Sequence, residues 1–509
     1  MNRTKSLFLF TLLASSIVLS ACSGLPQGTC TVNCGGGGGG STDATVSLTF
    51  QALPLTPPPN TNILSYSLTI GGLSLTPSSG NVVNFPGPFT VDLIRLQSDS
   101  AFLGSVLVPA GTYTSATVSL SAASVTYCTV TQGIPGCSSG TVTQVTGGAA
   151  APVFTFPNGG LVLSSAQDAG LSLVLNIGQT LTVTNSKVTA IVLTNVLPNV
   201  SLSSVTLGSA HTSSLTSTQL DYLDDVTGSV TVSGNNVTIT TANYGTLTAV
   251  ADSNTYYSPN CTTLGFANTI ACVQATQVAS ADIILKQDGT LYLAAYDPIS
   301  AASATNNDWI EGTVVFTPTS ATQFHIVAND ATVSTSSSLL PKPFPIGSPI
   351  TVNLAANAIF GVDTQGLTVP ADYTNFTGNL AATVLLPGQT VALHITDYEL
   401  TGGSPTGILA TADAVELRFS RIAGTSATNG NGTTFAYSSS TLPPYFGFTT
   451  AQQLVELTSG TPPSGATTYY DGVTGPNTIT ASQTYSIRAL YFGQFDATPF
   501  VAAKVRLNP

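Results

Sequence analysis

Apolar and polar residues alternate with a period of two along much of this chain, and this alternation restricts its possible folds more than any other feature. Near the beginning, Val46, Leu48 and Phe50 fall on one face, and Ser47 and Thr49 fall on the other. Successive side chains of a strand point to opposite sides of its sheet, so such a segment predicts a half-buried β-strand. The same period recurs at Leu64, Tyr66, Leu68 and Ile70, and at Ala116, Val118 and Leu120. The chain is therefore predicted to be all-β.

Composition supports this fold class and bounds the number of domains. The 509 residues include 47 glycines and 30 prolines, which interrupt the chain often, while threonine, valine and aromatic residues favour strands between the interruptions. At roughly 150 residues per domain, three or four domains are expected.

Only 7% of residues are charged and the formal net charge is -12, so no lysine and arginine cluster is available to neutralise phosphates. Nucleic acids and anionic lipid surfaces are excluded as partners.

The first residues have the order of a secretory signal. Arg3 and Lys5 supply positive charge, and an apolar stretch follows at 7–19. This stretch is shorter than the roughly 20 apolar residues of a transmembrane helix, the alternative interpretation. It leads into Leu19-Ser20-Ala21-Cys22, which resembles the lipobox of bacterial lipoproteins. The resemblance implies a signal peptide at 1–21, removal of that peptide, and attachment of a lipid to Cys22.

A flexible tether is expected at 22–42. It contains an unbroken run of glycines at 35–40, and a Gly-rich chain of about 20 residues reaches roughly 25 Å. Ser23 follows the lipidated cysteine, and by resemblance to the sorting rule of Gram-negative lipoproteins it favours the outer membrane. The expected protein is exported and held to a membrane by its N-terminal lipid.

The remaining cysteines fall into close pairs: Cys30 with Cys34, Cys128 with Cys137, and Cys261 with Cys272. In an exported chain such pairs predict three local disulfides. A zinc site is the alternative. Its spacing usually needs two short-spaced cysteine pairs or nearby histidines, and only Cys30 and Cys34 have such spacing. No metal is predicted.

A β-sandwich is expected at 43–210. Within it, the strand at 89–96, the pair Leu103-Gly104 and the turn Val108-Pro109-Ala110-Gly111-Thr112-Tyr113 resemble the signature of a domain of unknown function found in exported bacterial lipoproteins. Pro109 fixes φ, Gly111 permits the turn, and Tyr113 is expected to begin the next strand with its ring inward.

After residue 220 the chain shows a degenerate repeat. Three segments begin alike, at 226–230, 310–314 and 421–425, and each later ends in an apolar strand, a turn and an alanine-containing strand. Their lengths suit small five- or six-stranded barrels. We expect three barrel-like units, at 220–305, 309–417 and 418–509, the middle one carrying a long insert at 336–375. They resemble a second lipoprotein-associated repeat of unknown function, and neither resemblance supplies catalytic residues.

Recognisable catalytic motifs are missing from the sequence. It contains no nucleophile elbow, zinc-protease motif, phosphate-binding loop or EF-hand. The histidines are scattered, at His211, His325 and His394. Two carboxylate clusters are weak candidates for glycoside hydrolysis or calcium binding, and solvated turns or helix caps explain them more simply. They are Asp221, Asp224 and Asp225, and then Asp308 and Glu311. No cofactor is expected.

Aromatic residues are candidates for stacking on sugars. The only tryptophan, Trp309, opens the second barrel unit, and Tyr256 and Tyr257 lie in a loop-like stretch, as do Tyr445-Phe446 and Tyr469-Tyr470. The alternative is that Trp309 fills the interface between two barrels and that one ring of each pair is core.

The sequence therefore favours a non-enzymatic binding or scaffold lipoprotein of the bacterial surface or periplasm, with a glycan or an envelope protein as partner. One alternative is a carbohydrate-active enzyme or its carbohydrate-binding subunit. Another is a structural component of an envelope assembly.

Overall fold

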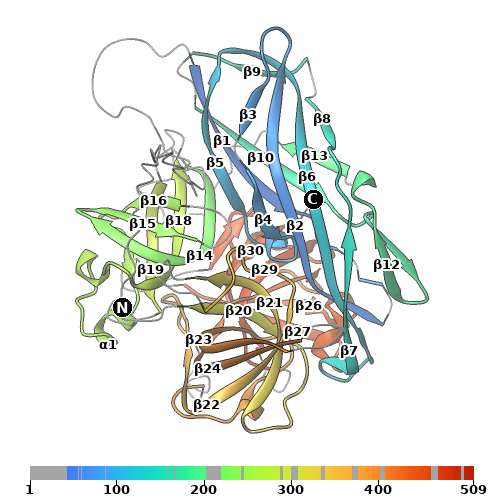
Figure 1. Ribbon diagram of the computed structural model, residues 1–509, viewed down its shortest axis with the longest axis vertical. Coiled ribbons are helices and arrows are strands. Elements are labelled where there is room, and N and C mark those ends of the chain that lie inside the picture. The colour runs from blue at the N-terminus through green and yellow to red at the C-terminus, as the bar shows by residue number, and fades with distance from the viewer. Residues whose placement is uncertain are drawn as a thin grey trace, which may run out of the picture.

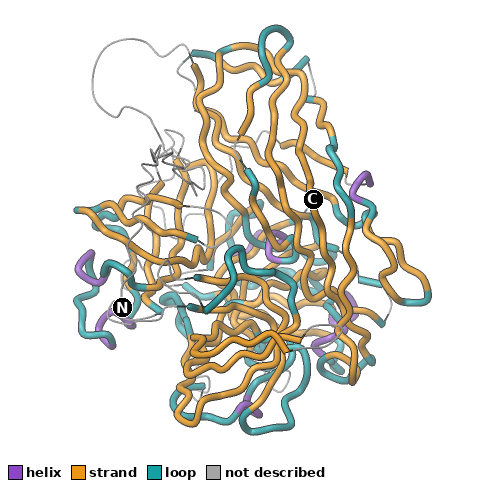
Figure 2. The backbone as a smooth tube through the Cα atoms, in the orientation of Figure 1, coloured by secondary structure: helices purple, strands orange, loops and turns teal. Residues whose placement is uncertain are grey.

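The chain is all-β, as predicted (Figure 2). The computed structural model describes residues 43–508 except 56, 59, 86, 157–158, 166–167, 196, 202–218, 242–245, 287–290, 300–307, 334–338, 370–375, 402–406, 460–467 and 494–497. Within these residues there is one α-helix, α1 (Asn260–Thr263), and no helix is long and apolar enough to cross a membrane. Short 3-10 helices are η1 (Arg95–Gln97), η2 (Leu193–Asn195), η3 (Ile270–Cys272), η5 (Ala382–Val384), η6 (Ser439–Thr441), η7 (Pro444–Phe446) and η8 (Pro476–Thr478).

Two sheets pack face to face in the N-terminal part, which we call the sandwich (43–201). One sheet has the order β13 (Leu197–Ser201), β10 (Asp168–Asn176), β1 (Asp43–Ala52), β5 (Ala101–Pro109). The other has the order β3 (Val83–Phe85), β2 (Thr61–Pro77), β6 (Gly111–Val130), β7 (Cys137–Gly147), and its remaining strands are β4 (Phe89–Asp92), β8 (Val153–Thr155) and β9 (Leu161–Leu163). A small hairpin, β11 (Leu181–Thr184) and β12 (Lys187–Ile191), lies beside them.

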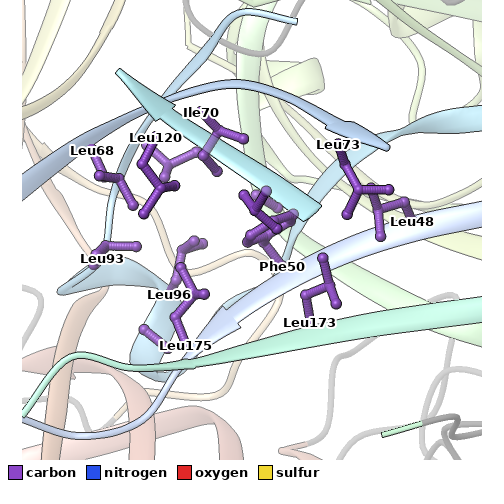
Figure 3. Packing of buried hydrophobic residues seen from close by; sticks show 14 of the residues in the cluster. Leu48, Phe50, Leu68, Ile70, Leu73, Leu93, Leu96, Leu120, Leu173 and Leu175 are labelled. Carbon is purple, nitrogen blue, oxygen red and sulfur yellow. The ribbon is translucent and has the colours of Figure 1, made fainter. Parts of the chain in front are cut away.

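The alternation read from the sequence forms the core of the sandwich. Leu48 and Phe50 of β1 and Leu68 and Ile70 of β2 belong to one buried cluster between the two sheets (Figure 3). All four side chains are buried, and burying a leucine or phenylalanine contributes roughly 1.5–3 kcal/mol. Tyr113 begins β6 with its ring inward, as predicted.

The next unit is the β14–β19 sheet (219–298). Its order is β16 (Thr246–Val250), β15 (Asn236–Thr240), β14 (Gln219–Ser233), β18 (Val278–Lys286), β19 (Leu291–Pro298), β17 (Tyr256–Tyr257). The sheet curls until β16 also pairs, in parallel, with β19.

A closed five-stranded barrel follows (309–418). Around the ring its strands are β20 (Trp309–Val314), β21 (Gln323–Thr332), β22 (Pro349–Val362), β24 (Gly407–Arg418) and β23 (Thr390–Thr401). The segment 336–375, expected to be an insert, contributes β22, which is one of the barrel strands. It is therefore part of the barrel itself.

The last unit is the β25–β30 sheet (420–507). Its order is β25 (Ser420–Thr425), β29 (Thr484–Tyr491), β30 (Phe500–Leu507), β27 (Gln452–Leu457), β26 (Thr434–Ser438), and β28 (Tyr469–Asp471) pairs with β30. A bridge between Ser426 and Tyr437 links the end of β25 to β26. In Figure 1 the sandwich stands above, the β14–β19 sheet lies to the left and the closed barrel lies below.

Candidate functional site

A cavity of about 610 Å³ lies where the sandwich, the closed barrel and the β25–β30 sheet meet. The sandwich supplies the stretch before β2 and the short helix η1. The closed barrel contributes β20 and the turn before β23, and the third unit contributes β25 with η6 and η7. The cavity therefore depends on the docking of three parts of the chain.

Three charged residues, one from each unit, meet beside this cavity. Arg95 of η1 and Arg421 of β25 both approach Glu311 of β20, whose Oε1 lies 3.1 Å from Arg95 Nη1 and 3.2 Å from Arg421 Nη1. At most 8% of each of these side chains is exposed. A carboxylate shared between two guanidinium groups fixes the orientation of all three units, because charge-assisted hydrogen bonds are short and directional.

Two further carboxylates complete this centre. Asp330 Oδ2 lies 3.1 Å from Arg95 Nη1, and Asp99 Oδ2 lies 2.9 Å from Arg421 Nε. Burial acts to raise the pKa of Asp99, but Arg421 and Arg95 outweigh it and hold the pKa below its ordinary value. Asp99 therefore remains ionised in its buried position.

The ion pairs continue from this centre into the β14–β19 sheet. Lys504 Nζ lies 2.5 Å from Asp224 Oδ2, and Arg488 lies 3.6 Å from Asp224 Oδ1 and 3.5 Å from Asp282 Oδ1. Of the 11 lysines and arginines in the sequence, this buried network holds Arg95, Arg418, Arg421, Arg488, Lys504 and Arg506. A chain with few charges thus concentrates most of its cations where its units meet.

The carboxylates of this network were expected to be solvated. Asp224 and Glu311 were assigned to turns or helix caps at unit junctions, yet both are buried, in β14 and β20. Asp308 is buried as well. The expectation was wrong because an ion partner far along the chain, such as Lys504 for Asp224, offsets part of the cost of removing the carboxylate from water.

The aromatic wall of the cavity comes from the segment around η7. Tyr445, Phe446 and Phe448 line it, and the Tyr445 hydroxyl donates a hydrogen bond to the carbonyl of Val314. The backbone N–H of Gly136 donates to the Tyr445 carbonyl at 2.7 Å. Tyr445 thereby joins the β25–β30 sheet to both other units.

Two of the predicted disulfides are present, between Cys128 and Cys137 and between Cys261 and Cys272. The first closes a loop beside the cavity, whereas the second lies in the core of the β14–β19 sheet. Disulfides persist in oxidising compartments, so both indicate an extracytoplasmic protein. Cys22, Cys30 and Cys34 lie outside the described residues.

The structure places the predicted stacking aromatics in the interior. Trp309, Tyr256 and Tyr257 are each less than a tenth exposed. Trp309 packs with Val278 of the β14–β19 sheet and Ala392 of the barrel. Burial therefore favours the packing role over ligand stacking. No group of three or more potential metal ligands occurs among the described residues.

Sequence reasoning missed the buried arginines and the buried lysine of the ion-pair network. Their signal was a charged residue inside an otherwise apolar strand, as in Ile487-Arg488-Ala489 or Ala503-Lys504-Val505. Such a residue predicts a buried ion pair when few charges are present elsewhere.

The search of protein-family models and that of curated proteins find no match to this chain.

Proposed function

We propose that this protein is an exported, lipid-anchored binding protein of the cell envelope that holds a ligand in the cavity between its units and performs no catalysis. The observation that carries the proposal is the cavity itself, which is lined by three units and lies beside buried ion pairs. Its volume lies within the roughly 300–1,000 Å³ of small-molecule sites.

The lining of the cavity supports binding over hydrolysis. Glycoside hydrolysis commonly uses two carboxyl groups about 5–9 Å apart on either side of the bond. Glu311 is the one carboxylate among the described residues that line the cavity, and its Oε1 is shared by Arg95 and Arg421. The carbohydrate-active enzyme therefore receives less support than a carbohydrate-binding protein.

The topology supports our view that the three units after residue 220 are degenerate copies of one barrel. In the closed barrel the third strand pairs in parallel with the fifth, and the fourth pairs with the first. When the short strands β17 and β28 are left out of the count, the same two pairings occur in the β14–β19 sheet and in the β25–β30 sheet. Three stacked copies joined by ion pairs would also suit a scaffold.

The anchor is proposed to be Cys22, in the outer membrane as Ser23 indicates, with 22–42 as the tether. Replacing Cys22 with serine should prevent lipid attachment and move the protein out of the membrane fraction while the β-units stay folded. An acyl chain contributes about 0.8 kcal/mol per buried CH₂, so losing the chains removes most of the membrane affinity.

Fractionation of cells grown with a labelled fatty acid would measure this effect, with Cys261→Ser as a control that removes a cysteine distant from the anchor. Wild-type protein that took up no label would contradict the anchor, and it would leave the cavity proposal standing.

A further inference from the structure

We propose that the ligand of the cavity is a short, uncharged oligosaccharide. The inference rests on the proposed function and deepens it. It starts from two carboxamides on the sandwich side of the cavity, Gln97 and Asn62, which are only 8% and 6% exposed. Among the described residues no side chain or backbone group pairs with the Gln97 amide, and Asn62 makes only a long 3.4 Å bond to its neighbour Ile63.

Neither residue contributes to the buried side-chain N and O atoms that lack a partner, so the side-chain amides of Gln97 and Asn62 are accessible from the cavity that they line. A ligand that displaces water from these amides keeps its affinity only if it reproduces the hydrogen bonds of that water. A carboxamide both donates and accepts hydrogen bonds, which suits hydroxyl groups.

The β25–β30 sheet presents the same chemistry. Thr425 and Thr484 line the cavity from this sheet, and among the described residues their hydroxyls have no hydrogen-bond partner. Uncharged donors and acceptors thus line the cavity from two different units.

The charged groups argue against a charged ligand. Arg95, Arg421 and Glu311 already neutralise one another beside the cavity, and Asp99 and Asp330 neutralise the arginines further. An anion or cation would have to break these buried pairs, and breaking one costs about 3–5 kcal/mol. A neutral ligand leaves them intact.

Ring surfaces provide the remaining contacts. Phe448, Pro443 and Pro444 are only partly buried and line the cavity together. A sugar presents hydroxyls at its edge and apolar C–H groups on its faces, so it would satisfy the amides and pack on these rings at once. The volume of about 610 Å³ suits a few sugar units.

The test uses the full-length protein, purified in detergent, on an array holding neutral glycans, charged glycans and short peptides. Ser440 is exposed at the cavity, so Ser440→Trp would fill the cavity without disturbing the core. Thr425→Val removes one hydroxyl. Thr248→Trp and Thr248→Val are the matched controls, since Thr248 is exposed on β16, in another unit.

We expect the wild type to bind neutral glycans, Ser440→Trp to lose binding at least tenfold, Thr425→Val to weaken it about fivefold, and both controls to match the wild type. Selective binding of charged glycans or peptides that Ser440→Trp abolishes would overturn the sugar and leave the binding function intact. Binding that persists in Ser440→Trp, or no binding to any ligand class, would overturn the proposed function as well.

Discussion

At the scale of single residues, a few buried charges determine how the units dock against one another. Glu311 sits between Ile310 and Gly312 in β20. Its two closest arginine partners, Arg95 and Arg421, come from other units, and Arg418 of its own barrel lies 3.9 Å away. A buried ion pair is a weak source of net stability, because desolvation offsets much of the attraction. Its larger effect is on specificity, since a misdocked arrangement would deprive Glu311 of its two closest partners, Arg95 and Arg421.

Replacing Glu311 with glutamine should therefore destabilise the protein by about 3 kcal/mol, because Arg95 and Arg421 would lose the charge that they share. Chemical denaturation measures the change in the free energy of unfolding. Glu399→Gln is the matched control: Glu399 is exposed on β23, and its substitution should change stability by less than about 0.5 kcal/mol. Equal effects of the two substitutions would show that the buried carboxylate does not hold the units together.

At the scale of elements, the loop closed by Cys128 and Cys137 links three units. Within the loop, Gly136 donates to Tyr445 of η7, and the N–H of Cys137 itself donates to the Val315 carbonyl at 2.9 Å. The side chains of Cys128, Cys137, Val315 and Tyr445 belong to one buried cluster. The disulfide within the sandwich thus positions the segment around η7, which forms the aromatic wall of the cavity.

Replacing both Cys128 and Cys137 with alanine should cost about 2–3 kcal/mol of stability, because the unfolded chain gains freedom when a short loop is opened. It should also increase hydrogen exchange in the 443–448 segment. The pair Cys261 and Cys272, replaced in the same way, is the control, since it closes a loop of similar length away from the cavity. Faster exchange at 443–448 in both double variants, or in neither, would contradict the positioning role.

At the scale of the whole molecule, the buried network makes docking of the units depend on pH. Burial raises the pKa of Asp297 to about 6 and that of Asp224 to about 7, from an ordinary value of 3.8. Conversely, although burial opposes it, Arg506 holds the pKa of Asp471 below its ordinary value. The folded protein therefore binds protons at Asp297 and Asp224 that the unfolded chain has already released.

Stability should fall as the pH rises from about 4 to 7, because in this window the unfolded state binds fewer protons than the folded state. Between pH 5 and pH 8, Asp297 alone would account for about 1 kcal/mol of this loss. Urea unfolding at pH 5 and pH 8 measures the difference. Asp297→Asn should reduce it, because the amide resembles the protonated acid at every pH, whereas Asp397→Asn, on the exposed part of β23, should not. A wild-type protein that is as stable at pH 8 as at pH 5 would refute the predicted pH dependence.

The sequence alone determined the features that depend on neighbours along the chain. Alternation predicted the strands, since a strand must place successive side chains on opposite faces, and the close spacing of Cys128 with Cys137 and Cys261 with Cys272 predicted both disulfides. The turn at Pro109 and Gly111 predicted the inward ring of Tyr113.

Only the tertiary structure decided which residues meet across units. Arg95, Glu311 and Arg421 are separated by more than a hundred residues from one another, and no local pattern relates them. The burial of Asp224 could not be predicted either, because its partner Lys504 lies near the other end of the chain. Side-chain alternation is a property of one strand, whereas desolvation of a charge is compensated only by whatever the complete fold brings beside it.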